Sequence, residues 1–243
     1  MLDLILEHFY IEVTRRCNMK CNHCLRGQAE NIDLEIEDIN KLFDNLNIKN
    51  INTLTITGGE PTLNPKAILL ILKKIISKGI IVDNFNMVIN GSNYNQILID
   101  GLNEFYKYCK GVNLICSRDQ YHRQPKEDVL KKYKRLPYFI CNYVELSNQE
   151  IIQIGRAREN KLGTKESYND TIKKFNYCKQ NNYPITYDID NNIKLKQLYL
   201  SSKGLYSFHI IDIPFKQIDG LCIYNINEVK NKLTKTNKVK FFK

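Results

Sequence analysis

The chain has 243 residues, of which 43% are hydrophobic, and 36 lysines and arginines against 26 acidic residues give a formal net charge of +10. This length suits one α/β domain with a small extension. The sequence has no apolar run of about 18 residues and no basic N-terminal segment, so it predicts neither a membrane span nor a secretory signal. We therefore expect a cytoplasmic protein with reduced cysteines. The lysines are spread along the chain, so the charge supports a nucleic-acid partner only weakly and leaves it open.

The first predicted strand, residues 9–14, is apolar and β-branched, and Cys17, Cys21 and Cys24 follow it in the spacing CxxxCxxC. Three thiolates are one too few for a closed four-cysteine metal site. A [4Fe–4S] cluster on three cysteines leaves one iron free to bind another ligand, and chemistry can take place there. The alternative is a zinc site completed by a nearby histidine or a distant cysteine.

Helices and strands alternate along the rest of the chain. The spacing of apolar residues predicts helices over 33–43, 65–78, 93–108, 125–135 and 165–181, and strands over 51–57, 81–89, 112–117 and 139–145. From residue 183 the pattern changes to two alternating runs around a glycine turn. These runs predict a β-hairpin over 194–211, and the lysine-rich residues 228–243 predict a basic tail or surface helix.

Strands that alternate with helices of this length predict an α/β fold with a parallel sheet and right-handed crossover connections. Five or six strands are too few for a closed eight-stranded barrel. We expect a core domain over residues 1–182 and an extension over 183–243 that contains the hairpin and the basic tail. In such folds the carboxyl ends of the strands meet at one edge, which carries the active site.

Four polar motifs follow predicted strands and should lie near the loop that carries Cys17, Cys21 and Cys24, here called the cysteine loop. Residues 58–61 are Gly-Gly-Glu-Pro, in which glycines let the backbone approach a ligand and Glu60 offers a carboxylate to an ammonium group. Asn90 ends the third strand, and the run 117–122 is Ser-Arg-Asp-Gln-Tyr-His. Residues 155–157 are Gly-Arg-Ala, whose arginine could bind a carboxylate with its planar fork. Ordinary turns, a surface loop and a surface salt bridge are the alternatives.

The cysteine spacing and the Gly-Gly-Glu-Pro turn, in this order and each at the end of a strand, resemble the radical S-adenosylmethionine (radical SAM) superfamily. The resemblance covers residues 9–160 well. It implies a partial (β/α)6 barrel of the TIM type, a [4Fe–4S] cluster on Cys17, Cys21 and Cys24, and SAM on the fourth iron. In that family the reduced cluster cleaves SAM to methionine and a 5′-deoxyadenosyl radical, which abstracts hydrogen from a carbon. A flavodoxin or ferredoxin type of protein is then the expected one-electron donor.

The resemblance also implies roles for the other motif residues. Cofactor contacts are expected from His23, Gly58, Gly59, Glu60, Asn90, Ser117 and Arg156. Among these, His23 takes the aromatic position that packs near the adenine, and a solvated loop histidine is the alternative. Asp119 and His122 lie further along the loop that Ser117 begins, so we expect them to be the catalytic residues on the substrate side.

Five cysteines remain, namely Cys109, Cys116, Cys141, Cys178 and Cys222. No CxxC pair follows Cys24, so we expect a single cluster, with Cys116 and Cys141 as buried hydrophobic residues. An auxiliary cluster that uses Cys178 and Cys222 is the alternative. The cysteine loop, the Ser-x-Asp motif and the hairpin look most like peptide-maturing members of the family, so a peptide or protein is the expected substrate. A nucleotide or other small molecule is the alternative. A non-catalytic iron–sulfur or zinc sensor is an alternative from another class, and it would need neither the Gly-Gly-Glu-Pro turn nor SAM.

Overall fold

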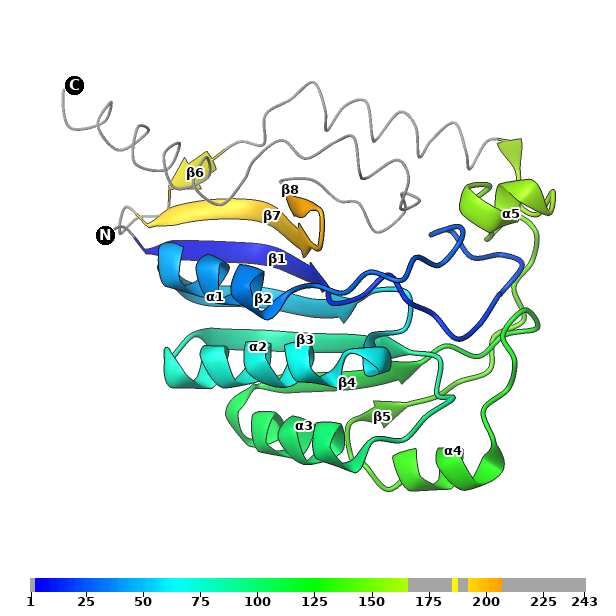
Figure 1. The fold of residues 1–243 in the computed structure, drawn as a ribbon, viewed down its shortest axis with the longest axis horizontal. Coiled ribbons are helices and arrows are strands. Elements are labelled where there is room, and N and C mark those ends of the chain that lie inside the picture. The colour runs from blue at the N-terminus through cyan, green and yellow to red at the C-terminus, as the bar shows by residue number, and fades with distance from the viewer. Residues whose placement is uncertain (1–2, 166–184, 188–191, 207–243) are drawn as a thin grey trace.

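The computed structural model describes residues 3–165, 185–187 and 192–206 (Figure 1). The strands are β1 (Leu4–Glu12), β2 (Ile48–Thr57), β3 (Ile81–Ile89), β4 (Gly111–Cys116), β5 (Phe139–Ile140), β6 (Ile185–Tyr187), β7 (Ile193–Ser201) and β8 (Gly204–Tyr206). The helices are α1 (Ile36–Asn45), α2 (Pro65–Ser77), α3 (Gln96–Tyr108), α4 (Glu127–Tyr133) and α5 (Gly155–Glu159), with a short 3-10 helix, η1 (Pro61–Leu63).

A mostly parallel sheet forms the centre of the fold. Its strand order is β5-β4-β3-β2-β1-β7-β6, and each neighbouring pair from β5 to β7 is parallel. β6 and β8 are antiparallel to β7 and pair with its beginning and its end. The sheet is open over the residues that the structure describes, and this confirms an α/β fold of the partial-barrel kind.

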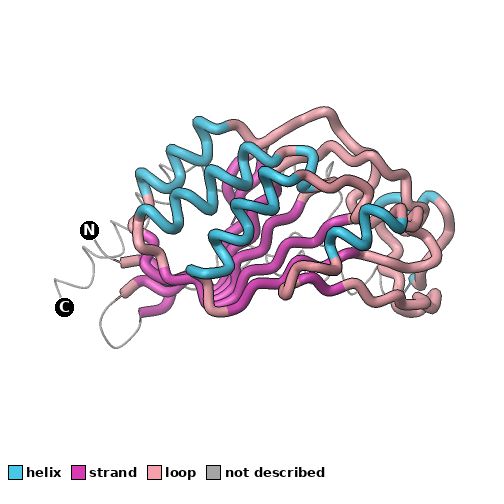
Figure 2. Tube along the Cα trace, turned by 90° about the horizontal axis from the view of Figure 1, so that it is seen from below, coloured by secondary structure: helices cyan, strands magenta, loops and turns pink. Residues whose placement is uncertain are grey.

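Helices α1, α2 and α3 cover one face of this sheet (Figure 2). Side chains of a strand alternate between the two faces. The row that faces the helices is apolar and buried, and the next row on the opposite face is polar; the first contains Phe9, Leu54, Phe85 and Val112, and the second Tyr10, Thr55, Asn86 and Asn113. The core therefore lies between the sheet and the helices and fixes the carboxyl ends of the strands next to one another.

The predicted elements are present where the structure describes them, but several differ in extent. β1 begins at Leu4, before its predicted start at residue 9. β5 stops at Ile140 instead of residue 145, because the strand beside it ends at Cys116. The chain then pairs with the loop after β4, where Val144 donates its N–H to the carbonyl of Arg118 at 3.0 Å. α5 is a helix where only a turn was expected.

The predicted hairpin is present over its described residues 194–206 as β7 and β8, and its first strand pairs in parallel with β1, so it continues the main sheet. Residues 207–211 of the prediction lie outside the described residues. Residues 166–181 of the last predicted helix and the basic tail over 228–243 lie outside the described residues, as do Cys178 and Cys222. The division of the chain near residue 183 stays a prediction. Within the described ranges, no helix has the length and apolar character needed to cross a membrane.

Candidate active site at the cysteine loop

The cysteine loop connects β1 to α1 at the carboxyl ends of the parallel strands (Figure 1). A cavity of about 260 Å³ lies beside it. Most of the residues nominated from the sequence line this cavity: Cys17, Cys21, His23, Cys24, Gly59, Glu60, Asn90, Ser117, His122 and Arg156. Gly58 precedes Gly59 in the turn, and Asp119 contacts both histidines of this set. The fold thus brings five separate segments of the chain together around one space.

The three cysteines are free and half-buried. Burial raises the pKa of the Cys17 thiol, and it raises the pKa of Cys21 to about 11. The positive charge of Arg156 acts in the opposite direction on the pKa of both thiols. At neutral pH these two groups are therefore protonated, and a metal that binds them must displace their protons.

The Gly-Gly-Glu-Pro turn packs directly on the cysteine loop. The N–H of Gly59 donates to the carbonyl of Thr14 at 2.8 Å, and the N–H of Glu60 donates to that of Arg16 at 2.7 Å. A Cβ atom on Gly58 would lie 2.4 Å from the Thr14 carbonyl oxygen, and one on Gly59 would lie 2.3 Å from that of Arg16. The glycines are therefore required by the approach of two backbones, which differs from the predicted reason. Their contact with SAM stays a prediction.

Glu60 is only 1% exposed, and its carboxylate already has partners. Oε2 accepts the N–H of Asn90 at 2.7 Å, while Oε1 accepts the N–H and the hydroxyl of Thr62. Burial raises the pKa of Glu60, and these hydrogen bonds oppose that rise. Asn90 extends the link to the cysteine loop, because its side-chain amide donates to Asn18 Oδ1 at 2.8 Å. Glu60 thus joins the end of β3 to the turn, and its contact with an ammonium group stays a prediction.

The Gly-Arg-Ala segment contacts the C-terminal end of the cysteine loop. The N–H of Arg156 donates to the carbonyl of Cys24 at 2.9 Å. Gly155 has a φ of +54°, and a Cβ there would lie 2.4 Å from the carbonyl oxygen of Leu25. The side chain of Arg156 is buried and lines the cavity with the thiols, so it is not part of a surface salt bridge.

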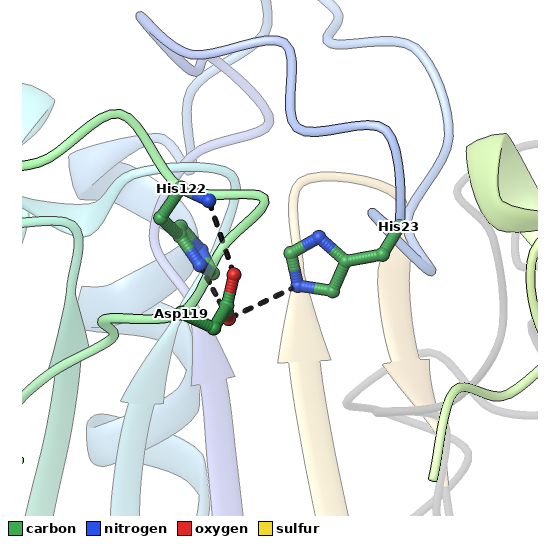
Figure 3. A group of neighbouring side chains, drawn as sticks. All are labelled: His23, Asp119 and His122. Atoms are coloured by element: carbon green, nitrogen blue, oxygen red, sulfur yellow. Dashed lines mark hydrogen bonds and ion pairs between the residues drawn. The ribbon is translucent and has the colours of Figure 1, made fainter. Parts of the chain in front are cut away.

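Asp119 is the centre of a polar cluster with His23 and His122 (Figure 3). Its Oδ2 lies 2.7 Å from Nδ1 of His122 and 3.5 Å from Nε2 of His23. Its Oδ1 accepts the N–H groups of Tyr121 and His122. The ring of His23 also packs on that of Tyr121, with 5.0 Å between the ring centroids. His23 is therefore held within the site and is not a solvated loop residue.

Sequence reasoning missed a buried network behind the cysteine loop. Arg15 donates to Oε1 of Glu12 at 2.9 Å, and the hydroxyl of Tyr199 donates to Oε2 at 2.6 Å. Arg26 donates to the Tyr199 hydroxyl at 2.8 Å. Burial raises the pKa of Tyr199, so its hydroxyl stays neutral and can donate. The network ties both ends of the loop to β7. A charged Glu12 in an apolar strand was a sequence signal for it, whereas nothing distinguished Tyr199.

The residues around the cavity fit an iron–sulfur cluster with SAM. Two buried nitrogen atoms there, Nδ1 of His23 and Nε of Arg156, have no hydrogen-bond partner among the described residues. A buried polar group without a partner costs about 1–3 kcal/mol, so such atoms indicate a missing acceptor. The sulfur atoms of a cluster and the carboxylate of SAM are acceptors of this kind. Three soft thiols beside a buried arginine suit that anionic pair.

The fold and the site define an α/β protein with a cofactor site at the carboxyl ends of its parallel strands. The family model of the radical SAM superfamily matches residues 11–191, which is more than half of the chain. The chain therefore belongs to the radical SAM superfamily, the enzymes that use a [4Fe–4S] cluster and S-adenosylmethionine.

Two curated proteins are similar in sequence. An uncharacterized protein of Methanocaldococcus jannaschii is 26% identical over 213 residues, which cover 86% of this chain and 62% of that protein. The GTP 3′,8-cyclase of Rhizobium etli is 29% identical over 99 residues, which cover 37% of this chain and 27% of the cyclase. The chain thus spans less than two thirds of the length of either relative.

Two solved structures are also similar. One is anSMEcpe with bound AdoMet and a peptide, at 15% identity and a TM-score of 0.45, with 57% of this chain and 42% of that one covered. The other is SuiB of Streptococcus suis bound to the precursor peptide SuiA, at 17% identity and a TM-score of 0.40, with 64% and 37% covered.

Proposed function

We propose that the protein uses SAM and a [4Fe–4S] cluster to modify a peptide or protein by hydrogen abstraction. The observation that carries the proposal is the meeting of Cys17, Cys21 and Cys24 with the Gly-Gly-Glu-Pro turn around one cavity. When bound, the cluster supplies the electron that cleaves SAM to methionine and a 5′-deoxyadenosyl radical. The three cysteines hold it and leave one iron for SAM.

The other residues of the cavity divide between cofactor and substrate. The guanidinium of Arg156 donates to the SAM carboxylate, and the turn at Gly59 and Glu60 receives its amino group. Ser117, Asn90 and the ring of His23 complete the SAM side. Asp119 and His122 act as the catalytic residues on the substrate side, since they lie beyond Ser117 on the same loop.

Two features support a peptide as the substrate. The cysteine loop and the segment from Ser117 to Asp119 resemble those of peptide-maturing members. The sheet face opposite the helices also carries neutral hydrogen-bonding groups, among them Asn86 and Asn113, whose amides are joined at 3.0 Å. Amide and hydroxyl groups can pair with the N–H and C=O groups of a bound chain.

A positively charged rim supports a protein electron donor of the flavodoxin or ferredoxin type. A second cavity, of about 350 Å³, shares Cys21 with the cluster loop and is bordered by the exposed residues Lys20 and Arg123. Positive groups beside the cluster suit an acidic redox protein, because complementary charge speeds encounter. The oxygen sensitivity of such a cluster favours the reducing cytoplasm.

Anaerobic reconstitution tests the proposal. The protein should hold about four irons and four sulfides, and its electron paramagnetic resonance signal should change when SAM is added. With dithionite it should form 5′-deoxyadenosine. The triple variant Cys17→Ala, Cys21→Ala, Cys24→Ala should lose all three properties, whereas Cys178→Ser with Cys222→Ser should keep its iron. Stoichiometric zinc, or an iron signal indifferent to SAM, would leave a metal sensor in place of an enzyme.

A nucleotide is the second candidate substrate, supported by the likeness to the GTP 3′,8-cyclase over 99 residues. The two substrate classes separate in one assay. Nucleoside triphosphates and a short peptide encoded beside the gene are each added to the reduced protein with SAM. The true substrate raises 5′-deoxyadenosine above its uncoupled level and changes in mass.

A further inference from the structure

We propose that His23, Asp119 and His122 bind a divalent transition-metal ion beside the cluster cysteines. One ligand atom from each of the three lies within 4.8 Å of the others (Figure 3). Two imidazoles and one carboxylate are the donor set of non-haem iron sites and of several catalytic zinc sites. His23 comes from the cysteine loop and the other two residues from the loop after β4, so the fold, and not one local turn, assembles the set.

Backbone N–H groups hold one carboxylate oxygen of Asp119, and the other oxygen faces the two imidazoles. It is 6% exposed, and its Oδ1 accepts the N–H groups of Tyr121 and His122 at 2.8 and 3.0 Å. Its Oδ2 faces both imidazoles, at 2.7 Å from His122 Nδ1 and 3.5 Å from His23 Nε2. Nitrogen and oxygen ligands at about 2.0–2.2 Å from an ion have a similar spacing, so small side-chain shifts would admit it.

With the ring proton of His23 on Nδ1, a cation between these atoms also gives Nε2 a partner. Nδ1 of His23 is buried and has no partner within the described part of the chain. If the ring proton sits on Nδ1, where an acceptor of the cofactor can receive it, Nε2 turns a lone pair toward the carboxylate of Asp119. Two acceptors then face each other. A metal ion makes both of them ligands.

The proposed ion adjoins the place of the chemistry. Both histidines line the cavity of about 260 Å³ that the three cysteines share. Three protein ligands leave coordination positions open, as in catalytic metal sites. Those positions suit an oxygen of the substrate, such as a peptide carbonyl or a carboxylate. The inference rests on the proposed function, because a cluster on the thiols leaves only nitrogen and oxygen ligands for a second metal.

The test counts zinc in the cluster-loaded, full-length protein. After anaerobic reconstitution the protein is dialysed against Zn²⁺, and zinc, iron and sulfide are measured per chain. The wild type should take up about one zinc and keep its iron. Asp119→Asn and His122→Gln should each weaken zinc binding roughly tenfold or more, with iron and sulfide unchanged. His8→Gln is the matched control, because His8 lies on β1 outside the cavity lining, and it should bind zinc as the wild type does.

X-ray absorption at the zinc edge identifies the ligands, and nitrogen and oxygen neighbours alone are expected. A complete iron cluster with no more zinc in the wild type than in the two variants would overturn the metal site. The proposed function would then stand, with Asp119 and the histidines as a hydrogen-bonded group. Zinc with sulfur neighbours and a matching loss of iron would overturn both, because the zinc would occupy the cysteines.

Discussion

Arg156 is the residue whose loss should separate SAM binding from cluster binding. It is buried beside the thiols but is not one of the proposed iron ligands. Arg156→Gln removes a charge-assisted hydrogen bond worth about 1.5–3 kcal/mol, so SAM should bind roughly 10–100-fold more weakly. Calorimetric titration of the reconstituted protein with SAM measures this, and iron content should stay at the wild-type level. Arg158→Gln, an exposed residue on the same helix, is the control. Equal losses in both variants would show only that α5 tolerates no change.

The residues of the site could be predicted from the sequence, but the side chains and backbone groups that they contact could not. Glu60 and Asn90 could be nominated because each follows a strand. Their hydrogen bond, however, depends on how far β3 extends beside β2, and this is fixed by a register in which Thr55 lies next to Asn86. The spacing of apolar residues carries no such register. The same holds for His23, whose contact with Asp119 joins two loops that no local pattern relates.

At the scale of elements, the turn at Gly59 should tolerate no side chain. A Cβ there would lie 2.3 Å from the backbone of Arg16, and a backbone cannot rotate away as a side chain can. Gly59→Ala should therefore separate the turn from the cysteine loop and sharply lower both iron content and SAM affinity. Gly79→Ala is the matched control: its φ is +65° but nothing lies within 4 Å, so only strain of about 1–2 kcal/mol is expected. Normal iron loading of Gly59→Ala would contradict this reading of the turn.

Tyr199 should show that β7 supports the cysteine loop. Tyr199→Phe removes the hydroxyl that donates to Glu12 and accepts from Arg26, and leaves a buried carboxylate short of a donor. The free energy of unfolding should fall by about 1–3 kcal/mol, and less iron should be retained after gel filtration. In Tyr108→Phe the lost hydroxyl donates to the carbonyl of Ile80 away from the loop, so stability should fall without loss of iron. Similar iron contents in the two variants would remove β7 from the support of the site.

The elements themselves followed from the sequence to different degrees. The bounds of β3 and α2 agree closely with the predicted ranges, because their apolar patterns are long and Gly79 separates them. β5 is shorter than predicted, because an edge strand extends only as far as the neighbour it pairs with, and β4 ends at Cys116. The pairing of β7 with β1 was not foreseen, because it depends on contacts between opposite ends of the chain.

The whole molecule should fold without its cofactor. None of the three cysteines proposed to hold the cluster belongs to the hydrophobic core, which lies between the sheet and its helices. The triple variant Cys17→Ala, Cys21→Ala, Cys24→Ala should therefore keep its secondary structure and a cooperative thermal transition, as measured by circular dichroism. Loss of cooperativity would mean that the loop is part of the folding unit. The general fold could be predicted from the sequence, because strands that alternate with helices indicate a parallel sheet whose carboxyl ends share one edge.

The hydrogen bond between Tyr199 and Glu12 spans 187 residues of sequence. During synthesis, the three cysteines are therefore made long before β7, the strand whose Tyr199 contacts their loop. Until then the hydrogen bonds of Tyr199 with Glu12 and Arg26 cannot form, so the cysteine loop lacks this contact with β7. On the proposed function, we therefore expect iron and sulfide to bind after synthesis has passed residue 199, and a chain that stops earlier should be a poor recipient even though it carries all three cysteines.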